Sequence, residues 1–253
     1  MAKIKSSWED VNKWYHGQVG EEGHYYHKQL ILPALQPHLT GEGELSLLDL
    51  GCGQGILART LPAAFHYVGI DGSPSLIQSA KAISKNPKHQ FIFADATKKL
   101  PLTKRDFSHA AIVLALQNME SQDKAIENAA SHLRPGGKLM IVLNHPCFRI
   151  PRQSSWGIDE QKKLQYRRIE RYMSPLKIPI QMHPGKKEQS EQTWSFHHPL
   201  ADYTRWIKNA GMVIEEIQEL CSDKESTGKA AKMENRSRAE FPLFLVIFAT
   251  KKG

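Results

Sequence analysis

The segment "LLDLGCGQGILART", residues 47–60, joins an apolar run to a helical pattern through three closely spaced glycines. Buried strands of parallel sheets read as continuous apolar runs, and glycines are needed where the backbone turns tightly or a ligand lies against it. A helix that begins directly after such a turn offers unpaired N–H groups. The segment therefore predicts a strand, a ligand-binding turn and a helix in direct succession.

The following hundred residues repeat the same alternation. Apolar runs of strand length occur at 45–50, 66–71, 89–95, 109–116 and 138–144, and helical patterns at 54–62, 74–84 and 121–133 separate them. This order is typical of βαβ units and of a parallel sheet covered by helices on both faces. "RPGG" at 134–137 indicates the end of a helix and a turn into the fifth strand. We therefore predict a doubly wound, Rossmann-like α/β fold.

The C-terminal part of the chain completes this sheet. "PLADYTRWIKNAG", residues 199–211, is an amphipathic helical pattern that ends at Gly211. Two strand-like runs follow at 212–220 and 241–251, joined by a polar, charged stretch. We expect a seven-stranded, mostly parallel sheet in which the last strand is antiparallel.

The chain is expected to form one domain with additions at two places. Residues 1–44 combine the helical segment "HKQLILPAL" with a group of aromatic residues, and we expect them to form an N-terminal helical cap; the aromatic residues are Trp8, Trp14, Tyr15, Tyr25 and Tyr26. Residues 45–145 are the predicted cofactor-binding core, and 198–253 hold the C-terminal helix and closing strands. Between them, 146–197 lose all periodicity and are predicted to be a substrate-facing insertion with a helix near 160–172, because long structureless loops are uncommon in compact domains.

Charge is concentrated in this insertion. Residues 146–198 hold ten lysines and arginines against five acidic residues, which gives +5 of the chain's +8. Net charge informs about partners rather than fold, so the excess fits either an anionic small molecule or RNA.

The bulk properties point to a cytoplasmic protein without a membrane segment. Cys52, Cys147 and Cys221 lie far apart, so neither a disulfide framework nor a cysteine zinc site is indicated. The longest apolar runs are far shorter than the ~20 residues that span a bilayer.

Two classes of cofactor compete for the glycine-rich turn. Nicotinamide and flavin enzymes use G-x-G-x-x-G and place a pyrophosphate on the helix N-terminus. Here the spacing is G-x-G-x-G, and Asp49 precedes it. A carboxylate is a poor neighbour for a pyrophosphate, whereas it suits a cationic ammonium group.

Five segments, in this order and at this spacing, resemble class I S-adenosylmethionine-dependent methyltransferases of the small-molecule type: "DLGCGQG", "VGIDGSP", "FIFADATKKLPL", "IVLALQNME" and "LRPGGKLMIV". The resemblance covers residues 45 to about 145, and 198–251 more loosely. It implies S-adenosyl-L-methionine as cofactor, with Asp71 accepting both ribose hydroxyls and Asp95 receiving the adenine amino group beside the Ala96 amide. The predicted cofactor-binding residues are Asp49, Gly51, Cys52, Gly53, Gly55, Asp71, Gly72, Asp95, Ala96 and Leu116.

Residues for the methyl acceptor are sought after strands four and five, because ligands of open α/β sheets bind at the carboxyl ends of the strands. The candidates for catalysis are Asn118, Asn144 and His145; those for substrate binding are Gln117, Tyr26, Tyr166, Tyr172 and His198. His145 could act as a base or could cap the strand end by binding backbone groups. The end of the fourth strand lacks the Pro-Cys pair of enzymes that use a cysteine nucleophile, and Cys147 follows the fifth strand instead, so we do not expect Cys147 to be a nucleophile. The pair His197–His198 has no third ligand spaced with it, so no metal is expected.

The sequence therefore predicts in-line methyl transfer to a small-molecule acceptor that the 146–197 insertion encloses. Two alternatives remain open at this point. The basic insertion could bind RNA or a protein as the acceptor, or the chain could be a cofactor-binding module without turnover.

Overall fold

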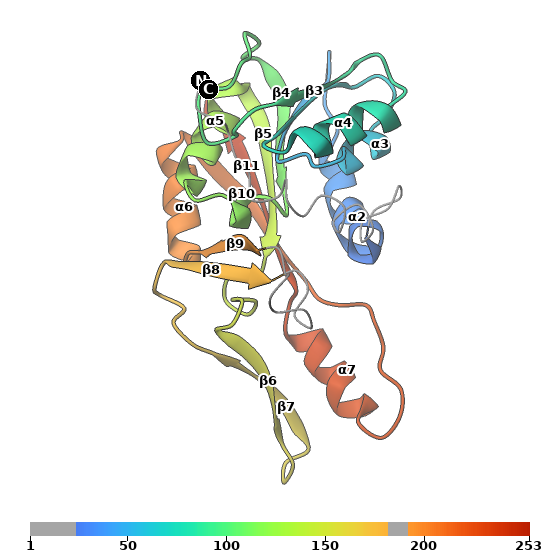
Figure 1. The fold of residues 1–253 in the computed structure, drawn as a ribbon, viewed down its shortest axis with the longest axis vertical. Helices are drawn as coiled ribbons and strands as arrows, with labels where there is room; N and C mark the ends of the chain where they lie inside the picture. The colour runs from blue at the N-terminus through green and yellow to red at the C-terminus, as the bar shows by residue number, and fades with distance from the viewer. Residues whose placement is uncertain (1–23, 182–191) are drawn as a thin grey trace.

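The computed structural model describes residues 24–181 and 192–253, and its centre is a seven-stranded sheet in the order β10-β11-β5-β4-β1-β2-β3 (Figure 1). The strands are β1 Ser46–Leu50, β2 His66–Asp71, β3 His89–Phe93, β4 Phe107–Val113, β5 Leu133–Asn144, β10 Met212–Leu220 and β11 Phe244–Lys251. β1 to β5 pair in parallel, while β11 is antiparallel to both β5 and β10. The predicted doubly wound sheet with an antiparallel last strand is confirmed.

Helices cover both faces of the sheet, as Figure 1 shows. α5 (Gln122–His132) and α6 (Leu200–Asn209) pack on one face, where Leu48 and Leu50 of β1 are buried. The other face, where Leu47 is buried, is covered by α3 (Ile56–Thr60), α4 (Pro74–Ile83) and the N-terminal helical segment. Because both faces are covered, burial is continuous along β1 and nearly so along β4 rather than alternating.

The N-terminal helical segment consists of η1 His27–Ile31, α2 Leu32–Leu35 and η2 Gln36–His38. Its Ile31 and Leu35 are fully buried against the sheet, in agreement with the predicted helix over "HKQLILPAL". The predicted contributions of Trp8, Trp14 and Tyr15 to a cap lie outside the described residues.

The expected helix at 160–172 is wrong. The chain instead forms an antiparallel hairpin of β6 (Ser154–Asp159) and β7 (Leu164–Ile169). Side-chain exposure alternates along the second strand, with Tyr166 and Arg168 exposed and Arg167 and Ile169 half-buried, which is a period of two. A second hairpin pairs β8 (Leu176–Gln181) with β9 (Gln192–His197).

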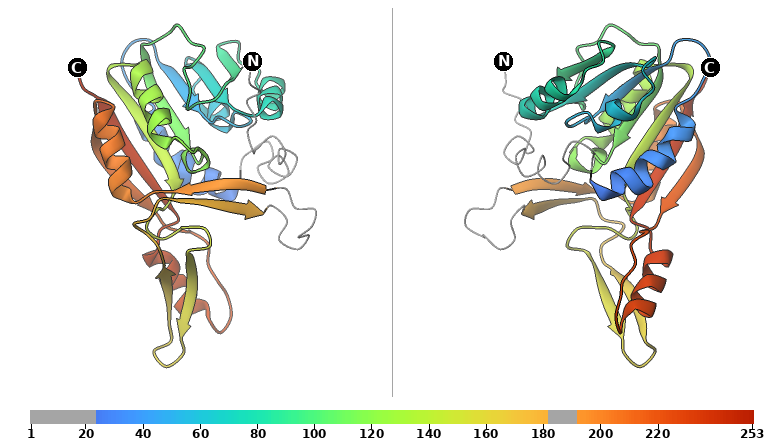
Figure 2. Two further views of the ribbon diagram at one scale, coloured as in Figure 1. Left: turned by 60° about the vertical axis from the view of Figure 1, so that its left-hand side comes forward. Right: turned by 90° about the vertical axis from the view of Figure 1, so that its right-hand side faces the viewer.

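α7 (Ala231–Glu240) lies in the polar stretch for which no helix is expected. Only Ser237 of this helix is buried, and its hydroxyl donates to the Gln165 carbonyl of β7 at 2.9 Å. In Figure 2, α7 and the β6–β7 hairpin project side by side from one end of the sheet, and we call this unit the arm. The helix has almost no apolar face because a narrow hairpin is its partner.

The "RPGG" segment differs in detail from the expected turn. α5 ends at His132, as predicted, but β5 begins at Leu133 and includes residues 134–137. The register between β4 and β5 shifts between Phe107 and His109, and Gly136 has a φ of +72°. The tight turn is thus accommodated as an irregularity inside the strand pair. None of the helices in the described part of the chain combines the length and apolar character needed to cross a bilayer.

Candidate functional site

The glycine-rich turn after β1 has a backbone that side chains would obstruct. Gly51 and Gly55 have φ values of +79° and +78°, in the left-handed region that favours glycine. A Cβ atom on Gly51 would lie 2.3 Å from the Cβ of Ala115, so this turn packs directly against the segment that follows β4. The turn therefore places backbone without side chains next to the end of β4.

Asp49, near the end of β1, has a buried carboxyl group, and 2% of the residue's surface is exposed. The Tyr67 hydroxyl donates to Asp49 Oδ2 at 2.7 Å, while Oδ1 is buried and accepts no hydrogen bond within residues 24–181 and 192–253. Burial raises the pKa of Asp49 to about 7, because the charged form loses its hydration. A buried carboxylate oxygen that lacks a partner fits a cationic group lying against the turn.

Asp71, at the end of β2, connects the glycine turn to α4. Its carboxylate accepts the Gly53 N–H at 2.9 Å and the Ser73 N–H at 2.8 Å. Ser73 in turn caps α4, since its hydroxyl accepts the Leu76 N–H at 3.2 Å. A carboxylate has acceptor positions only, which suits the hydroxyl groups of a ligand.

Asp95 follows β3 in a turn that its own side chain stabilises. The Thr97 N–H and hydroxyl both donate to Asp95 Oδ1, at 2.9 and 2.7 Å. Ala96 is buried, and the Asn128 amide donates to its carbonyl at 2.7 Å. Three carboxylates therefore stand at the ends of three neighbouring strands, β1, β2 and β3.

The chain turns sharply after β4. Leu114 has a φ of +52°, and its carbonyl accepts hydrogen bonds from the side chains of Gln117, at 2.9 Å, and Asn118, at 3.3 Å. These residues belong to the short helix η3 (Leu116–Asn118). Gln117 Oε1 is buried and has no partner in the described part of the chain. This amide oxygen is thus a free acceptor beside the end of β4.

The β8–β9 hairpin lies across this edge of the sheet, as Figure 1 shows. The Gln122 side chain donates to the Phe196 carbonyl of β9 at 3.0 Å, and Lys177 of β8 forms an ion pair with Glu120 at 3.2 Å. A narrow cavity of about 20 Å³ remains below it. Its lining comes from η3, the end of β5, the following loop, β9 and α6: Gln117, Asn144, Pro146, Arg149, Pro151, Ser195, Phe196, His197 and Tyr203.

Comparison with known proteins identifies the domain. Residues 47–137 match the methyltransferase domain family. The chain is 35% identical to an O-methyltransferase of Pyrenophora dematioidea, over 40% of this chain and 41% of the relative, and 25% identical to a ubiquinone biosynthesis O-methyltransferase of Rickettsia canadensis, over 45% and 48%. Each match therefore spans less than half of the curated relative.

The fold extends the likeness to almost the whole chain. A solved S-adenosylmethionine-dependent methyltransferase from Mesorhizobium loti superposes with a TM-score of 0.67 at 25% identity, over 87% of this chain and 96% of that one. The chain carries a class I S-adenosylmethionine-dependent methyltransferase domain. Its cofactor is S-adenosyl-L-methionine, and the unpartnered Asp49 oxygen beside the bare turn fits the cationic end of that molecule.

The remaining predicted cofactor residues of the methyltransferase domain follow β1, β2 and β4. Gly72 stands between Asp71 and Ser73 and is partly exposed. Cys52 and Leu116 are buried, with 7% and 0% of their surfaces exposed. Burial raises the pKa of the Cys52 thiol well above its usual value, so it remains a neutral filler of the turn.

His145 follows β5, and both of its ring nitrogens are engaged. Nδ1 accepts the Cys147 N–H at 3.2 Å, so the proton resides on Nε2, which donates to Glu219 at 2.7 Å. The residue is 1% exposed, and burial lowers its pKa although Glu219 acts in the opposite direction. This is the geometry of a neutral histidine that ties the strand end to β10. Asn144, by contrast, is exposed and lines the cavity.

The predicted substrate-binding residues are dispersed. Tyr172 accepts the Leu200 N–H at 3.0 Å and so anchors the loop before β8 to α6, while His198 pairs with Asp202 at 3.0 Å. Tyr26 packs on Phe244 and reaches Ser222 at 3.1 Å. Tyr166 lies on the arm, where its ring covers Gly157. Of the five predicted residues, Gln117 lines the cavity.

Sequence reasoning missed Arg149, Ser195 and Tyr203 as cavity residues. Arg149 was counted only within the basic insertion, and its signal was its position four residues after His145 at the end of a central strand. Ser195 and Tyr203 carried no such signal, because β9 and α6 approach the cavity only through the tertiary fold.

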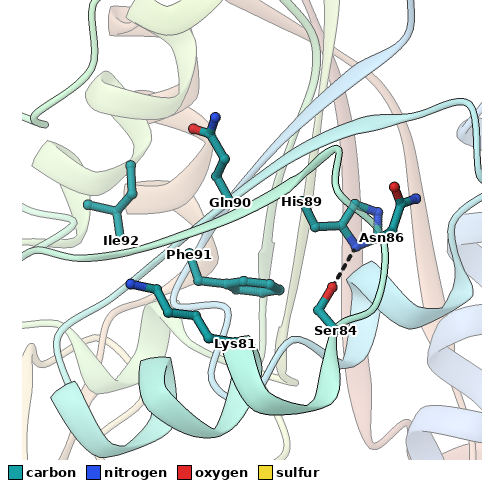
Figure 3. A pocket seen from close by; sticks show the side chains of 7 residues that line it. All are labelled: Lys81, Ser84, Asn86, His89, Gln90, Phe91 and Ile92. Atoms are coloured by element: carbon teal, nitrogen blue, oxygen red, sulfur yellow. Dashed lines mark hydrogen bonds between the residues drawn. The ribbon is translucent and has the colours of Figure 1, made fainter.

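A larger hollow lies at the opposite edge of the sheet, between β3 and the end of α4 (Figure 3). Figure 3 shows it bordered by Lys81, His89 and Phe91, with a hydrogen bond of 3.2 Å between Ser84 and His89. It is open, and its lining includes no residue of the glycine turn or of the β4 and β5 ends. This hollow therefore lies apart from the residues around the glycine turn and the ends of β4 and β5.

Proposed function

We propose that this protein transfers a methyl group from S-adenosyl-L-methionine to a small molecule bound between η3, the end of β5 and β9, at a cavity of about 20 Å³ that must widen to admit it. The observation that carries the proposal is the position of two unpartnered buried acceptors, Asp49 Oδ1 in the turn after β1 and Gln117 Oε1 after the adjacent strand β4. The names of the two O-methyltransferase relatives support a small acceptor.

The chemistry asks little of the protein beyond positioning. The cofactor supplies a methyl group on an already activated sulfonium carbon, and much of the rate comes from alignment and exclusion of water. Asp49, Asp71 and Asp95 would hold the cofactor through its cationic end, ribose and adenine. The β8–β9 hairpin would exclude water from the acceptor, with Gln117 and Asn144 orienting it.

Among the predicted catalytic residues, we assign direct contact with the acceptor to Asn144, because it is exposed at the cavity. Asn118 donates to the Leu114 carbonyl and would stabilise the turn that carries Gln117. His145 would hold the end of β5 in place. A base role requires His145 to lose its bond with the Cys147 N–H, which is the acceptor interaction of Nδ1.

The test is incubation of the purified protein with S-adenosylmethionine labelled on the methyl group and with cell extract, followed by separation of small-molecule, RNA and protein fractions. We expect the label in the small-molecule fraction, and its loss with the Asp71→Ala variant. Label in RNA or protein would overturn the small-molecule acceptor. Cofactor binding without any label transfer would identify a non-catalytic module.

An RNA acceptor is the second candidate, and the arm is the observation that favours it. Lys162, Lys163 and Arg168 are exposed on the projecting hairpin together with Tyr166, and basic and aromatic side chains together can bind and stack RNA. Binding to total RNA with steep salt dependence, lost on neutralising Lys162 and Lys163, would favour this candidate.

A further inference from the structure

The loop after β5 places an arginine at the cavity. The Arg149 N–H donates to the His145 carbonyl at 2.7 Å, which folds the loop into a tight turn. Arg149 is half-buried and lines the cavity together with Gln117 and Asn144. A guanidinium group therefore stands at the carboxyl end of the central strands, where acceptors bind in open α/β sheets.

Part of the Arg149 guanidinium group is buried without a hydrogen-bond partner in the described part of the chain. Its Nε is buried without a hydrogen bond, and no carboxylate of the described residues forms an ion pair with it. Its side chain instead lies 5.7 Å from the centre of the Trp156 ring. A buried N–H group without an acceptor is costly, and a ligand that offers an acceptor at this position would remove that cost.

A second positive charge close to Arg149 increases its need for an anionic partner. Arg167 lies close enough to act, after burial, as the second cause that lowers the pKa of Arg149, and it stacks on the same Trp156 ring at 5.0 Å. Glu219, the carboxylate at this end of the sheet, accepts from His145. The two arginines therefore create a positive field at the cavity that an anion would neutralise.

Gln117 defines a second chemical feature of the ligand. Its Nε2 donates a hydrogen bond to the Leu114 carbonyl. Its Oε1, which can only accept a hydrogen bond, is buried and has no donor in the described part of the chain. Because Arg149 and Gln117 both line the cavity, a ligand there would meet a hydrogen-bond donor and a hydrogen-bond acceptor. Guanidinium groups bind planar carboxylates with two parallel hydrogen bonds.

We propose that Arg149 binds a carboxylate group of the methyl acceptor, and that Gln117 accepts a hydrogen bond from its hydroxyl or amino group. The acceptor is therefore a small hydroxy- or amino-carboxylic acid. This inference rests on the proposed function for its methylation, but carboxylate recognition by Arg149 can be measured without turnover.

The probes are the three positional isomers of hydroxybenzoate, each matched with the hydroxybenzamide of the same shape, and phenyl phosphate. Binding is measured by ligand-observed NMR on the full chain in the presence of S-adenosylhomocysteine. The variants are Arg149→Gln, Arg149→Lys and, as control, Arg152→Gln, which removes the same charge from an exposed position in the same loop.

We expect at least one acid to bind the unaltered protein about 10-fold or more tightly than its amide, as a charge-assisted hydrogen bond predicts. Arg149→Gln should abolish this preference, Arg149→Lys should retain part of it, and Arg152→Gln should leave it intact. Equal binding of acids and amides, no binding of any acid, tighter binding of phenyl phosphate, or a preference unaltered in Arg149→Gln would each overturn the proposal.

The labelling experiment separates this inference from the proposed function. If the labelled small molecule is retained on an anion-exchange column and its formation falls with Arg149→Gln but not with Arg152→Gln, both are supported. A labelled neutral or cationic product would overturn the carboxylate inference and leave methyl transfer intact. If no molecule is labelled, the function fails, and the NMR comparison still decides whether Arg149 recognises carboxylates.

Discussion

Asp49 shows how the environment of one residue sets its chemistry. The unfolded chain ionises this group near pH 4, whereas in the folded protein burial raises its pKa to about 7. Between these values the folded state holds a proton that the unfolded state has released, so the Asp49 contribution to stability falls as pH rises from about 4 to about 7 and is constant above.

The ionisation of Asp49 should also determine how the affinity for the cofactor depends on pH. Only ionised Asp49 attracts a cationic ligand, so we expect the affinity for S-adenosylmethionine to rise about 10-fold between pH 6 and pH 8, with protons released on binding. Calorimetry in two buffers of different ionisation enthalpy measures both quantities. Asp49→Asn should weaken binding at pH 8 and flatten the pH dependence. An affinity that is independent of pH in the unaltered protein would contradict the assignment.

His145 is predicted to act through structure rather than through its basicity. Truncation by His145→Ala leaves the Cys147 N–H and Glu219 without a partner, and we expect a loss of about 2 kcal/mol in the free energy of unfolding. Glu219→Gln keeps an acceptor for Nε2–H and should cost less. Denaturant unfolding measures the stabilities. An activity that falls steeply in His145→Ala while stability and cofactor affinity are unaltered would identify a catalytic base instead.

At the scale of elements, we expect the stability of the arm to depend on the packing of the Trp156 ring. Trp156 packs edge-on against Phe241, with 5.4 Å between the ring centres. The guanidinium groups of Arg149 and Arg167 lie over the Trp156 ring. We expect Trp156→Ala to lower the local stability of the arm by about 2 kcal/mol, since it removes aromatic packing and two cation–π contacts. Hydrogen exchange should then accelerate in β6, β7 and α7.

The control for the arm is Ile158→Ala, at a position 55% exposed on the same strand. It should leave exchange in the arm nearly unaltered. In Trp156→Ala, amides of β1 and β4 should retain their protection, because the core packs without the arm. Faster exchange throughout the sheet would show that the arm is part of the central folding unit.

At the scale of the whole molecule, the cofactor site exists only when the sheet is complete. The carboxylates proposed to hold the cofactor come from the ends of β1, β2 and β3, so ligand binding should stabilise the folded state by mass action. At a concentration 100 times Kd we expect a gain of about 2.7 kcal/mol and a rise in Tm of roughly 5–10 °C for a chain of this length.

The Asp71→Ala variant should lose most of this rise in Tm at the same cofactor concentration, because it removes the acceptor assigned to the ribose and the bond to Gly53. Asp106→Ala is the matched control, since this carboxylate is exposed and paired with Lys104 on the surface. Thermal unfolding with and without S-adenosylmethionine measures the shift. A rise of equal size in Asp71→Ala would contradict the ribose assignment.

Prediction from sequence succeeded where conformation follows from neighbouring residues. The strand that contains Asp49, the glycine turn and the helix predicted at 74–84 each carry their signal within a few residues, and the structure contains all three. The hairpin at 154–169 and α7 were missed because their conformations depend on each other: Ser237 bonds β7, and Phe241 packs on Trp156, across more than 70 residues of sequence.

The sequence by itself determined the parallel sheet, its antiparallel last strand and the carboxylates at three strand ends, because periodicity and turn residues are local properties of the chain. Tertiary structure alone decided that Arg149, Gln117 and β9 meet at one cavity, that Tyr166 lies on the arm, and that both nitrogens of His145 are engaged. These outcomes depend on partners supplied by distant segments, and no pattern along the chain encodes which distant groups will share a buried space.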